Sequence, residues 1–399
     1  MSVNFDGVSA PLAKILESAL CGREVSEADG TRLLSADGRD LDAVAAVANE
    51  LRLRVHGRRT SYVVTRNINF TNVCHMGCRF CGFGRHRGSA EAELLSMEEL
   101  ARRAREAANR GATEVCIQGG LHPDLPGSHY REIVKTVKAA VPDIHIHAFS
   151  PFEIYYGARK SHMDYRDFLA DLKDCGLGSI PGTAAEILDV EVRRVLTKNK
   201  LSAESWVEII KAAHGVGLPS TSTMMYGHVD EPRHWAAHIG LLREIQKETG
   251  GFSEFVPLGF VHYESPLYLQ DSRTRPGPTR REHIAIHAVA RIMLHGHIDN
   301  IQASWVKLGP QLATQAQSFG VNDLGGTLMN ESISRASGAL YGQEITAPEM
   351  EAMIAAAGFE PWQRTTLYRP AESPSAAAAA TLCPRSRWQA QQIAALELV

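Results

Sequence analysis

The chain has 399 residues, of which 44% are hydrophobic and 22% are charged, and its formal net charge is -3. This composition is typical of a globular protein with a large core, and no long block of one charge sign points to nucleic acid or an anionic membrane as a partner. The N-terminus has no basic segment followed by an apolar run, and nowhere do about 18 apolar residues stand together. We therefore expect a cytoplasmic protein that does not cross a membrane.

Residues 1–60 are predicted to form a helical N-terminal extension, because apolar residues recur there at helical spacing. In residues 61–370, short β-rich runs alternate with longer helical segments, a pattern typical of βα units on a parallel sheet. Several units run from a helix through a glycine into a strand. Gly111, Gly176 and Gly217 fit the left-handed position that ends such a helix.

The repeated units predict an α/β fold with a TIM-type barrel. Strand-like runs include residues 178–183 ("GSIPGT") and 300–306 ("NIQASWV"), and residues 323–328 supply a candidate eighth strand. A complete (β/α)8 barrel and a six-unit barrel both fit, and we favour the complete form. Residues 371–399 are rich in Ala, Ser and Pro, which predicts a mobile low-complexity tail.

Three cysteines, Cys74, Cys78 and Cys81, stand in the spacing C-x3-C-x2-C without a fourth nearby. A structural zinc site needs four ligands, and a ferredoxin-type electron carrier normally supplies four cysteines per cubane. His75 and His86 could in principle complete a zinc site, but a histidine that directly follows Cys74 cannot easily turn back onto the same metal. The remaining interpretation is one 4Fe-4S cluster held through three irons, with the fourth iron open to a small molecule, as a catalytic metal site requires.

This motif, with Phe80 before its last cysteine, resembles that of the radical S-adenosylmethionine (SAM) enzymes, which makes Phe80 a candidate cofactor-binding residue. The resemblance implies that SAM binds the fourth iron and that one electron splits it to a 5′-deoxyadenosyl radical. It also implies that Gly119 and Gly120 bring bare backbone to the methionine amine of SAM, although a tight βα turn would need the same glycines. Ser150 and Glu153 are candidates for SAM binding, or else mark the start of a helix.

Segments between residues 67 and 338 resemble the 4-hydroxyphenyl transferases of deazaflavin synthesis, CofH, the second subunit of FO synthase. The cysteine motif and "YGH" are shared with two related menaquinone enzymes, aminofutalosine synthase and dehypoxanthine futalosine cyclase. The combination of "IQASWVKLG" with "NDLGGTL" favours the deazaflavin family. Two positions depart from its pattern, since Gly82 stands where Ala is expected and Gly259 where Pro is expected.

The resemblance implies that L-tyrosine is cleaved between Cα and Cβ and that its 4-hydroxybenzyl group is joined to 5-amino-6-(D-ribitylamino)uracil, on the way to FO, the coenzyme F-420 precursor. It implies FO synthase subunit 1 (CofG) as a functional partner on a separate polypeptide, and an electron donor. Candidate substrate contacts at predicted strand ends are Tyr226, His228, Ser304, Asn322 and Asp323. The alternative for the last two is an Asx turn before two glycines. A non-enzyme alternative is an iron-sulfur electron carrier, which needs no barrel and no vacant iron.

Overall fold

The computed structural model describes residues 3–197, 199 and 201–371, so the predicted tail lies almost wholly outside the described residues. The strands in the described part are β1 (Arg59–Val63), β2 (Thr65–Asn69), β3 (Glu114–Gln118), β4 (His145–Ala148), β5 (Ser220–Tyr226), β6 (Phe252–Gly259), β7 (Asp323–Gly326) and β8 (Glu360–Arg364). The helices are α1 (Ala10–Leu20), α2 (Glu27–Leu34), α3 (Gly38–His56), α4 (Met97–Asn109), α5 (Ser128–Ala140), α6 (Pro151–Ser161), α7 (Tyr165–Asp174), α8 (Val190–Leu196), α9 (Ala203–Gly215), α10 (Pro232–Thr249), α11 (Pro266–Gln270), α12 (Arg280–Leu294), α13 (Trp305–Leu308), α14 (Pro310–Ala316), the 3-10 helix η1 (Gln317–Phe319), α15 (Ile333–Ala336) and α16 (Ala347–Ala356).

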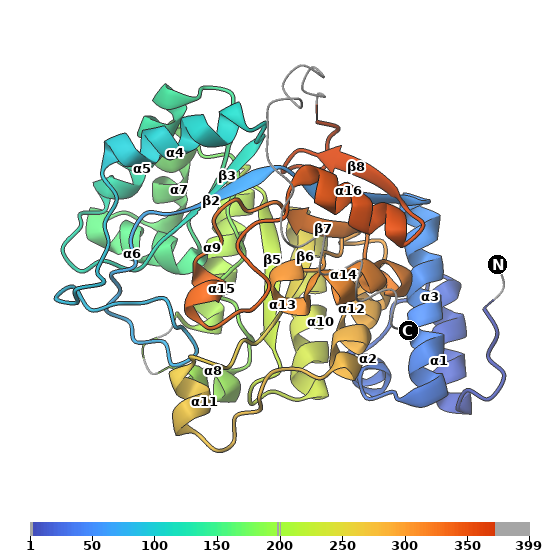
Figure 1. Cartoon of the computed structure of the whole chain (residues 1–399). Helices are drawn as coiled ribbons and strands as arrows, with labels where there is room; N and C mark the ends of the chain where they lie inside the picture. Colours follow the sequence, from blue (N-terminus) through green and yellow to red (C-terminus); the bar gives the residue numbers. More distant parts are fainter. Residues whose placement is uncertain (1–2, 198, 200, 372–399) are drawn as a thin grey trace.

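The strands lie in the middle of the molecule, with helices around them (Figure 1), and parallel pairing joins them. β2 pairs with β3, β3 with β4, β5 with β6, and β7 with β1. Two short segments fill the gaps, because Ser179 and Ile180 bridge β4 to β5, and Ile301 and Gln302 bridge β6 to β7. Since β1 runs into β2 through Val64, the pairs and bridges return to their start after eight positions, and the prediction of a TIM-type barrel fold is confirmed.

The fourth and seventh ring positions are shorter than the sequence predicts. Residues 178–183 and 300–306 each contribute only a pair of bridged residues. Pro181 has no N–H to extend the fourth ladder. At the seventh position the chain turns into α13 at Trp305. The predicted helix ends are confirmed, because Gly111, Gly176 and Gly217 have φ of 82°, 109° and 76°.

The amino end of the barrel is closed by a buried ionic network. β1 pairs with β7 on one side and with β8 on the other, which sets Val63 opposite Arg364. The Arg364 guanidinium, 2% exposed, donates to Asp323 Oδ1 at 3.0 Å and to Glu254 Oε2 at 3.3 Å. The functional end of such a barrel is therefore the opposite one, where the strands finish and the connecting loops gather.

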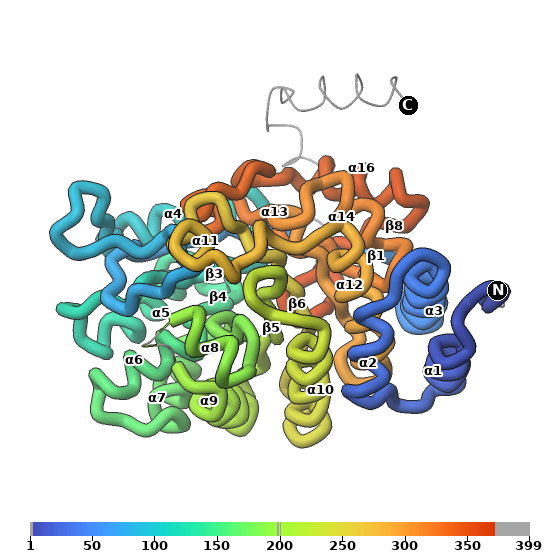
Figure 2. The backbone as a smooth tube through the Cα atoms, turned by 90° about the horizontal axis from the view of Figure 1, so that it is seen from below, coloured from blue at the N-terminus to red at the C-terminus, as the bar shows by residue number. Residues whose placement is uncertain are grey.

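The N-terminal helices pack on the outside of the barrel, α2 against α10 and α3 against α12 (Figure 2). Arg52 of α3 is fully buried and donates to Val321 O at 3.2 Å, Arg59 O at 2.7 Å and Thr60 Oγ1 at 2.7 Å. Burial lowers the Arg52 pKa to about 10. These bonds tie α3 to the amino ends of the first and last barrel strands. The division of the chain at residues 60 and 370 stays a prediction. Within the described ranges, no helix has both the length and the apolar character to span a bilayer.

Candidate active site

The three cysteines lie on one loop, residues 70–95, which leaves β2 at the barrel mouth. The backbone N–H of Cys74 donates to Arg85 O at 3.0 Å, which closes the loop at its base. The N–H of Cys81 donates to Cys78 O at 3.1 Å in a tight turn. These two backbone bonds fix the fold of the loop segment that carries the three cysteines.

Neighbouring elements form hydrogen bonds to the loop between the second and third cysteines. The backbone N–H of Arg79 donates to Leu196 O of α8 at 3.1 Å. The carbonyl of Arg79 accepts from the N–H of Leu267 at 2.7 Å and from Ser265 Oγ at 3.2 Å, at the start of α11. Phe80 packs against the hydrophobic core. Two helices, α8 and α11, and the hydrophobic core therefore hold the cysteine segment in place.

The two unexpected glycines have steric reasons. An ideal Cβ at Gly82 would lie 2.3 Å from the carbonyl oxygen of Ala336, and the Gly82 N–H donates to Ser337 Oγ at 3.3 Å. An ideal Cβ at Gly259 would lie 2.9 Å from Cε1 of His283. At Gly82 the end of α15 closes directly onto the cysteine loop, so the expected Ala does not fit without a shift of backbone.

The glycine pair after β3 packs against the same loop. An ideal Cβ at Gly119 would lie 2.6 Å from the Phe70 ring. At Gly120 it would lie 2.3 Å from Val73 O and 2.9 Å from Cys74 Cβ. Glycine is needed here for close approach of two backbones, which is the packing interpretation of the pair. Its contact with the methionine amine of SAM stays a prediction.

Ser150 and Glu153 form the capping box that begins α6. Glu153 Oε2 accepts from the Ser150 N–H at 2.8 Å and from Ser150 Oγ at 2.7 Å, while Oε1 accepts from the Gly119 N–H at 3.0 Å. Burial raises the Glu153 pKa to about 7, against the lowering effect of these hydrogen bonds. Glu153 thus braces the glycine turn from behind. Direct contact of either side chain with SAM stays a prediction.

Tyr226 and His228 lie in the wall behind the mouth. Tyr226 is fully buried, its hydroxyl is 2.6 Å from His283 Nδ1, and its ring meets Trp235 edge to face. His228 is also fully buried, with Nε2 3.0 Å from Met225 O and Nδ1 accepting the following backbone N–H at 2.8 Å. Tyr226 therefore points to the helical layer and His228 is engaged by backbone, so neither side chain faces the mouth in this structure, and contact of either with substrate stays a prediction.

Asn322 and Asp323 lie at the wrong end of the barrel for substrate contact. Asn322 Oδ1 accepts from Arg291 Nη2 at 2.6 Å and from the Ile301 N–H at 2.8 Å. Asp323 is the first residue of β7 and belongs to the ionic network at the amino end. Its Oδ1 accepts from the Gly325 N–H at 2.7 Å, which is the Asx-turn alternative. The prediction that these residues face the mouth is wrong.

A set of polar side chains on the inner strand faces was not predicted. Asn69 Nδ2 donates to Gln118 O at 3.1 Å, and Thr183 Oγ1 donates to Gln118 Oε1 at 2.9 Å. All three side chains are partly exposed, whereas Ile68 and Ile117 beside them are fully buried. Solvent therefore reaches these amides from the barrel interior.

The missed residues leave a signal in the sequence. Asn67 and Asn69 alternate with apolar residues on β2, and Cys116 and Gln118 do so on β3. Strands of a parallel barrel are normally apolar on both faces, so period-two polar residues mark a face that lines a wet interior. Ser304, partly exposed before α13, stands at the carboxyl end of the seventh ring position, and its substrate contact stays a prediction.

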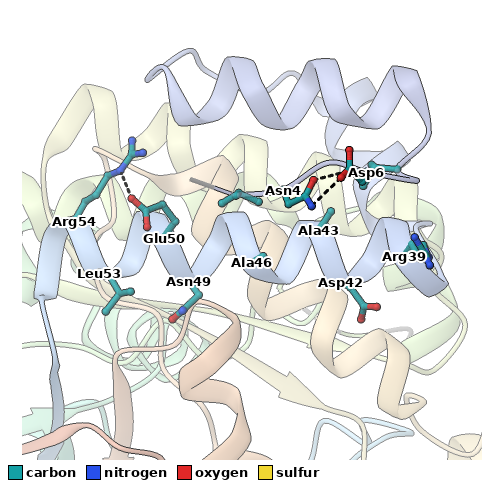
Figure 3. A pocket seen from close by; sticks show the side chains of 12 residues that line it. Asn4, Asp6, Arg39, Asp42, Ala43, Ala46, Asn49, Glu50, Leu53 and Arg54 are labelled. Carbon is teal, nitrogen blue, oxygen red and sulfur yellow. Dashed lines mark hydrogen bonds and ion pairs between the residues drawn. The ribbon is translucent and has the colours of Figure 1, made fainter. Parts of the chain in front are cut away.

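A cleft of about 860 Å³ lies elsewhere, along α3 beneath the N-terminal segment (Figure 3). Its walls include the ion pair between Arg54 Nε and Glu50 Oε1 at 3.0 Å and the Asn4–Asp6 turn. All its lining residues fall between residues 3 and 54, on the flank away from the cysteine loop (Figure 1). The cleft is therefore separate from the mouth.

The three thiols of the cysteine loop are the candidate ligands of a 4Fe-4S cluster. Among the described residues, no three His, Cys, Asp or Glu side chains converge as one metal ion requires. A 4Fe-4S cube binds each thiolate through a different iron, so its ligands stand apart around it. Cys74, Cys78 and Cys81 share one loop at the mouth and are all partly exposed, and their binding of a cluster stays a prediction.

Comparison with known proteins defines the class. Residues 68–242 match the radical SAM superfamily, and residues 249–377 match the CofH/MqnC C-terminal region. The structure of methylornithine synthase (PylB) superposes with a TM-score of 0.69 at 18% identity, over 87% of this chain and 97% of that chain. HydG, a maturase of the [FeFe]-hydrogenase, gives a TM-score of 0.72 at 16% identity, over 91% of this chain and 78% of that chain. These two show a shared fold, and together with the family matches they define a radical SAM enzyme, whose cofactors are a 4Fe-4S cluster and SAM.

Closer relatives define the family. An FO synthase of Mycobacterium tuberculosis is 56% identical over 336 residues, which are 84% of this chain and 39% of that protein. The chain thus spans about two fifths of the length of the FO synthases it matches. A 5-amino-6-(D-ribitylamino)uracil--L-tyrosine 4-hydroxyphenyl transferase of Methanopyrus kandleri is 49% identical over 343 residues, which are 86% of this chain and 93% of that protein. The chain belongs to this transferase family.

Proposed function

We propose that this chain cleaves L-tyrosine between Cα and Cβ and joins the 4-hydroxybenzyl group to 5-amino-6-(D-ribitylamino)uracil in FO biosynthesis. The observation that carries the proposal is the 49% identity across 93% of the Methanopyrus transferase. The cysteine loop at the barrel mouth supports it, because an electron carrier would need neither the barrel nor an open iron position.

Cys74, Cys78 and Cys81 would hold the cluster through three irons. When bound, the cluster and SAM supply a radical that abstracts a hydrogen atom from the substrate. The chain's own task is to keep this chemistry away from water. The contacts of the cysteine loop with α8, α11 and α15 support that task, since they cover the loop from several sides of the mouth.

The inner faces of the strands suit both substrates. Amides such as Asn69 and Gln118 offer donors and acceptors that a polyol-bearing uracil and a phenol need. Met225 and Leu258, both partly exposed, add apolar surface for an aromatic ring. A wall of mixed amide and apolar groups therefore supports binding of an aromatic amino acid beside a polar acceptor.

FO synthase subunit 1 (CofG), on a separate polypeptide, is proposed to take the product, and a one-electron donor is proposed to reduce the cluster. The greater length of the FO synthases supports the first, because they carry further chain beyond the matched part. We further propose that the enzyme works in the cytoplasm.

The test is anaerobic incubation of the reconstituted enzyme with SAM, a reductant and each candidate substrate, followed by mass analysis. Isotope-labelled tyrosine with the diaminouracil should give a labelled hydroxybenzyl adduct and 5′-deoxyadenosine. Turnover of 3-[(1-carboxyvinyl)oxy]benzoate to aminofutalosine, with no tyrosine consumed, would replace the proposal with a menaquinone-type activity. Omission of SAM is the control, since it should abolish both products.

A further inference from the structure

A lysine approaches the cysteine loop from the far side of the mouth. Lys307 lies on α13, after the seventh ring position, and its Nζ donates to Ser334 Oγ at 2.7 Å. The backbone N–H of Ser334 donates to both carboxylate oxygens of Glu331, at 3.0 and 2.9 Å. Lys307 and Glu331 are therefore held around one serine, where the seventh and eighth ring positions end.

The charge of Lys307 reaches the cysteine loop. Burial lowers the pKa of Lys307, while Glu331 and the thiol of Cys81 act on it in the raising direction. The geometry gives the same placement, because Ser334 lies on α15, and Ser337 at the end of that helix accepts from the N–H of Gly82, the residue after Cys81, at 3.3 Å. In a site shielded from water, such a charge acts more strongly than on the surface.

A second cation lies on the other side of the loop. Arg193 of α8 is 6% exposed and within electrostatic range of Cys78. Its guanidinium donates to the carbonyls of Ala185, Ile187 and Leu201. Because those bonds hold the backbone together, Arg193 cannot be neutralised without loss of structure. Lys307 is the cation whose electrostatic effect can be tested.

We propose that the positive charge of Lys307 tunes the reduction potential of the cluster. Its ammonium stabilises the reduced cluster and so raises the reduction potential. The inference rests on the proposed binding of the cluster by Cys74, Cys78 and Cys81. Reduction by a one-electron donor adds one negative charge to the cluster and its thiolates. A fixed positive charge nearby stabilises that state more than the oxidised one.

The test is an EPR-monitored redox titration of reconstituted enzyme without SAM, after iron and sulfide content are measured. Lys307→Met should shift the midpoint to more negative potential by about 59 mV or more, which is a tenfold lower ratio of reduced to oxidised cluster at fixed potential. Lys307→Arg keeps the charge and should stay near wild type. Lys138→Met is the matched control, because Lys138 is also partly buried but bonds Pro142 O and Ile144 O before β4, at the other end of the barrel.

A wild-type midpoint in Lys307→Met with full iron content overturns the inference. If Lys307→Met loses iron, Glu331→Gln is the variant that tests the inference. Loss of its negative charge should make the midpoint potential less negative, and the Gln side chain can still accept a hydrogen bond from the Ser334 N–H. An unchanged or more negative midpoint in Glu331→Gln then overturns it. Wild-type enzyme that binds no cluster would instead overturn the proposed cysteine site.

Discussion

Replacement of Gly120 by Ala tests how closely the second strand end packs on the cysteine loop. The added Cβ would lie 2.3 Å from Val73 O, 2.8 Å from Val73 C and 2.9 Å from Cys74 Cβ. Since these atoms are backbone or directly attached to it, no flexible side-chain end can yield. The loop must move by about 1 Å, and overpacking of this kind costs about 1–3 kcal/mol of unfolding free energy.

The assay compares thermal unfolding, iron content and SAM cleavage between Gly120→Ala and wild type. We expect a lower melting temperature and a loss of bound iron, because the displaced residue carries the Cys74 thiolate. Gly215→Ala is the control, since an ideal Cβ at Gly215 meets nothing within 4 Å. Wild-type iron content and stability in Gly120→Ala would refute the reasoning.

Three further predictions concern the loop, the ionic network and pH. Gly82→Ala, whose Cβ would meet the Ala336 carbonyl at 2.3 Å, should lower SAM cleavage and melting temperature together, while unchanged cleavage would show that the loops separate freely. Arg364→Met leaves the Asp323 carboxylate buried without its cation and should cost about 3–5 kcal/mol in urea unfolding, whereas a cost below 1 kcal/mol, as at a surface pair, would contradict burial. Burial lowers the His147 pKa from 6.5 to about 4, so the unfolded chain binds a proton that the folded chain does not. Unfolding free energy should therefore fall by up to about 3 kcal/mol as pH drops from 6.5 to 4, with a shallower slope in His147→Asn.

Structural features that depend on a short stretch of sequence could be predicted. The spacing of Cys74, Cys78 and Cys81 is local, and one loop carries all three. The barrel was also readable, because each helix, glycine and strand unit is local and repeats. Gly176 ends its helix in the left-handed conformation, as its place in such a unit predicts.

Features set by strand register could not be predicted. Asn322 and Asp323 precede two glycines, which suggests a loop, but β7 pairs with β1 so that Asp323 lies opposite Ser61 at the strand start. β8 was missed because Pro361 disfavours an interior strand, and only its pairing with β1 makes it one. Such pairings join residues about 260 to 300 positions apart, which no local pattern reports.

The placement of Tyr226 failed for a different reason. The sequence predicts the position of Tyr226 at the end of β5, but the predicted face of the strand is wrong. Met225 points inward and is partly exposed, whereas Tyr226, one residue on, must point to the helices. Successive side chains along β5 point to opposite faces, and this period-two alternation assigns Met225 rather than Tyr226 to the mouth.

The most direct test of the account is to change Cys74, Cys78 and Cys81 singly to Ala and measure bound iron, sulfide and 5′-deoxyadenosine formation anaerobically. Cys175→Ala is the control, because Cys175 caps α7 outside the mouth. The account predicts that each of the three variants loses the cluster and SAM cleavage while Cys175→Ala keeps both. A cluster that still cleaves SAM in a variant lacking any one of the three thiols would contradict it.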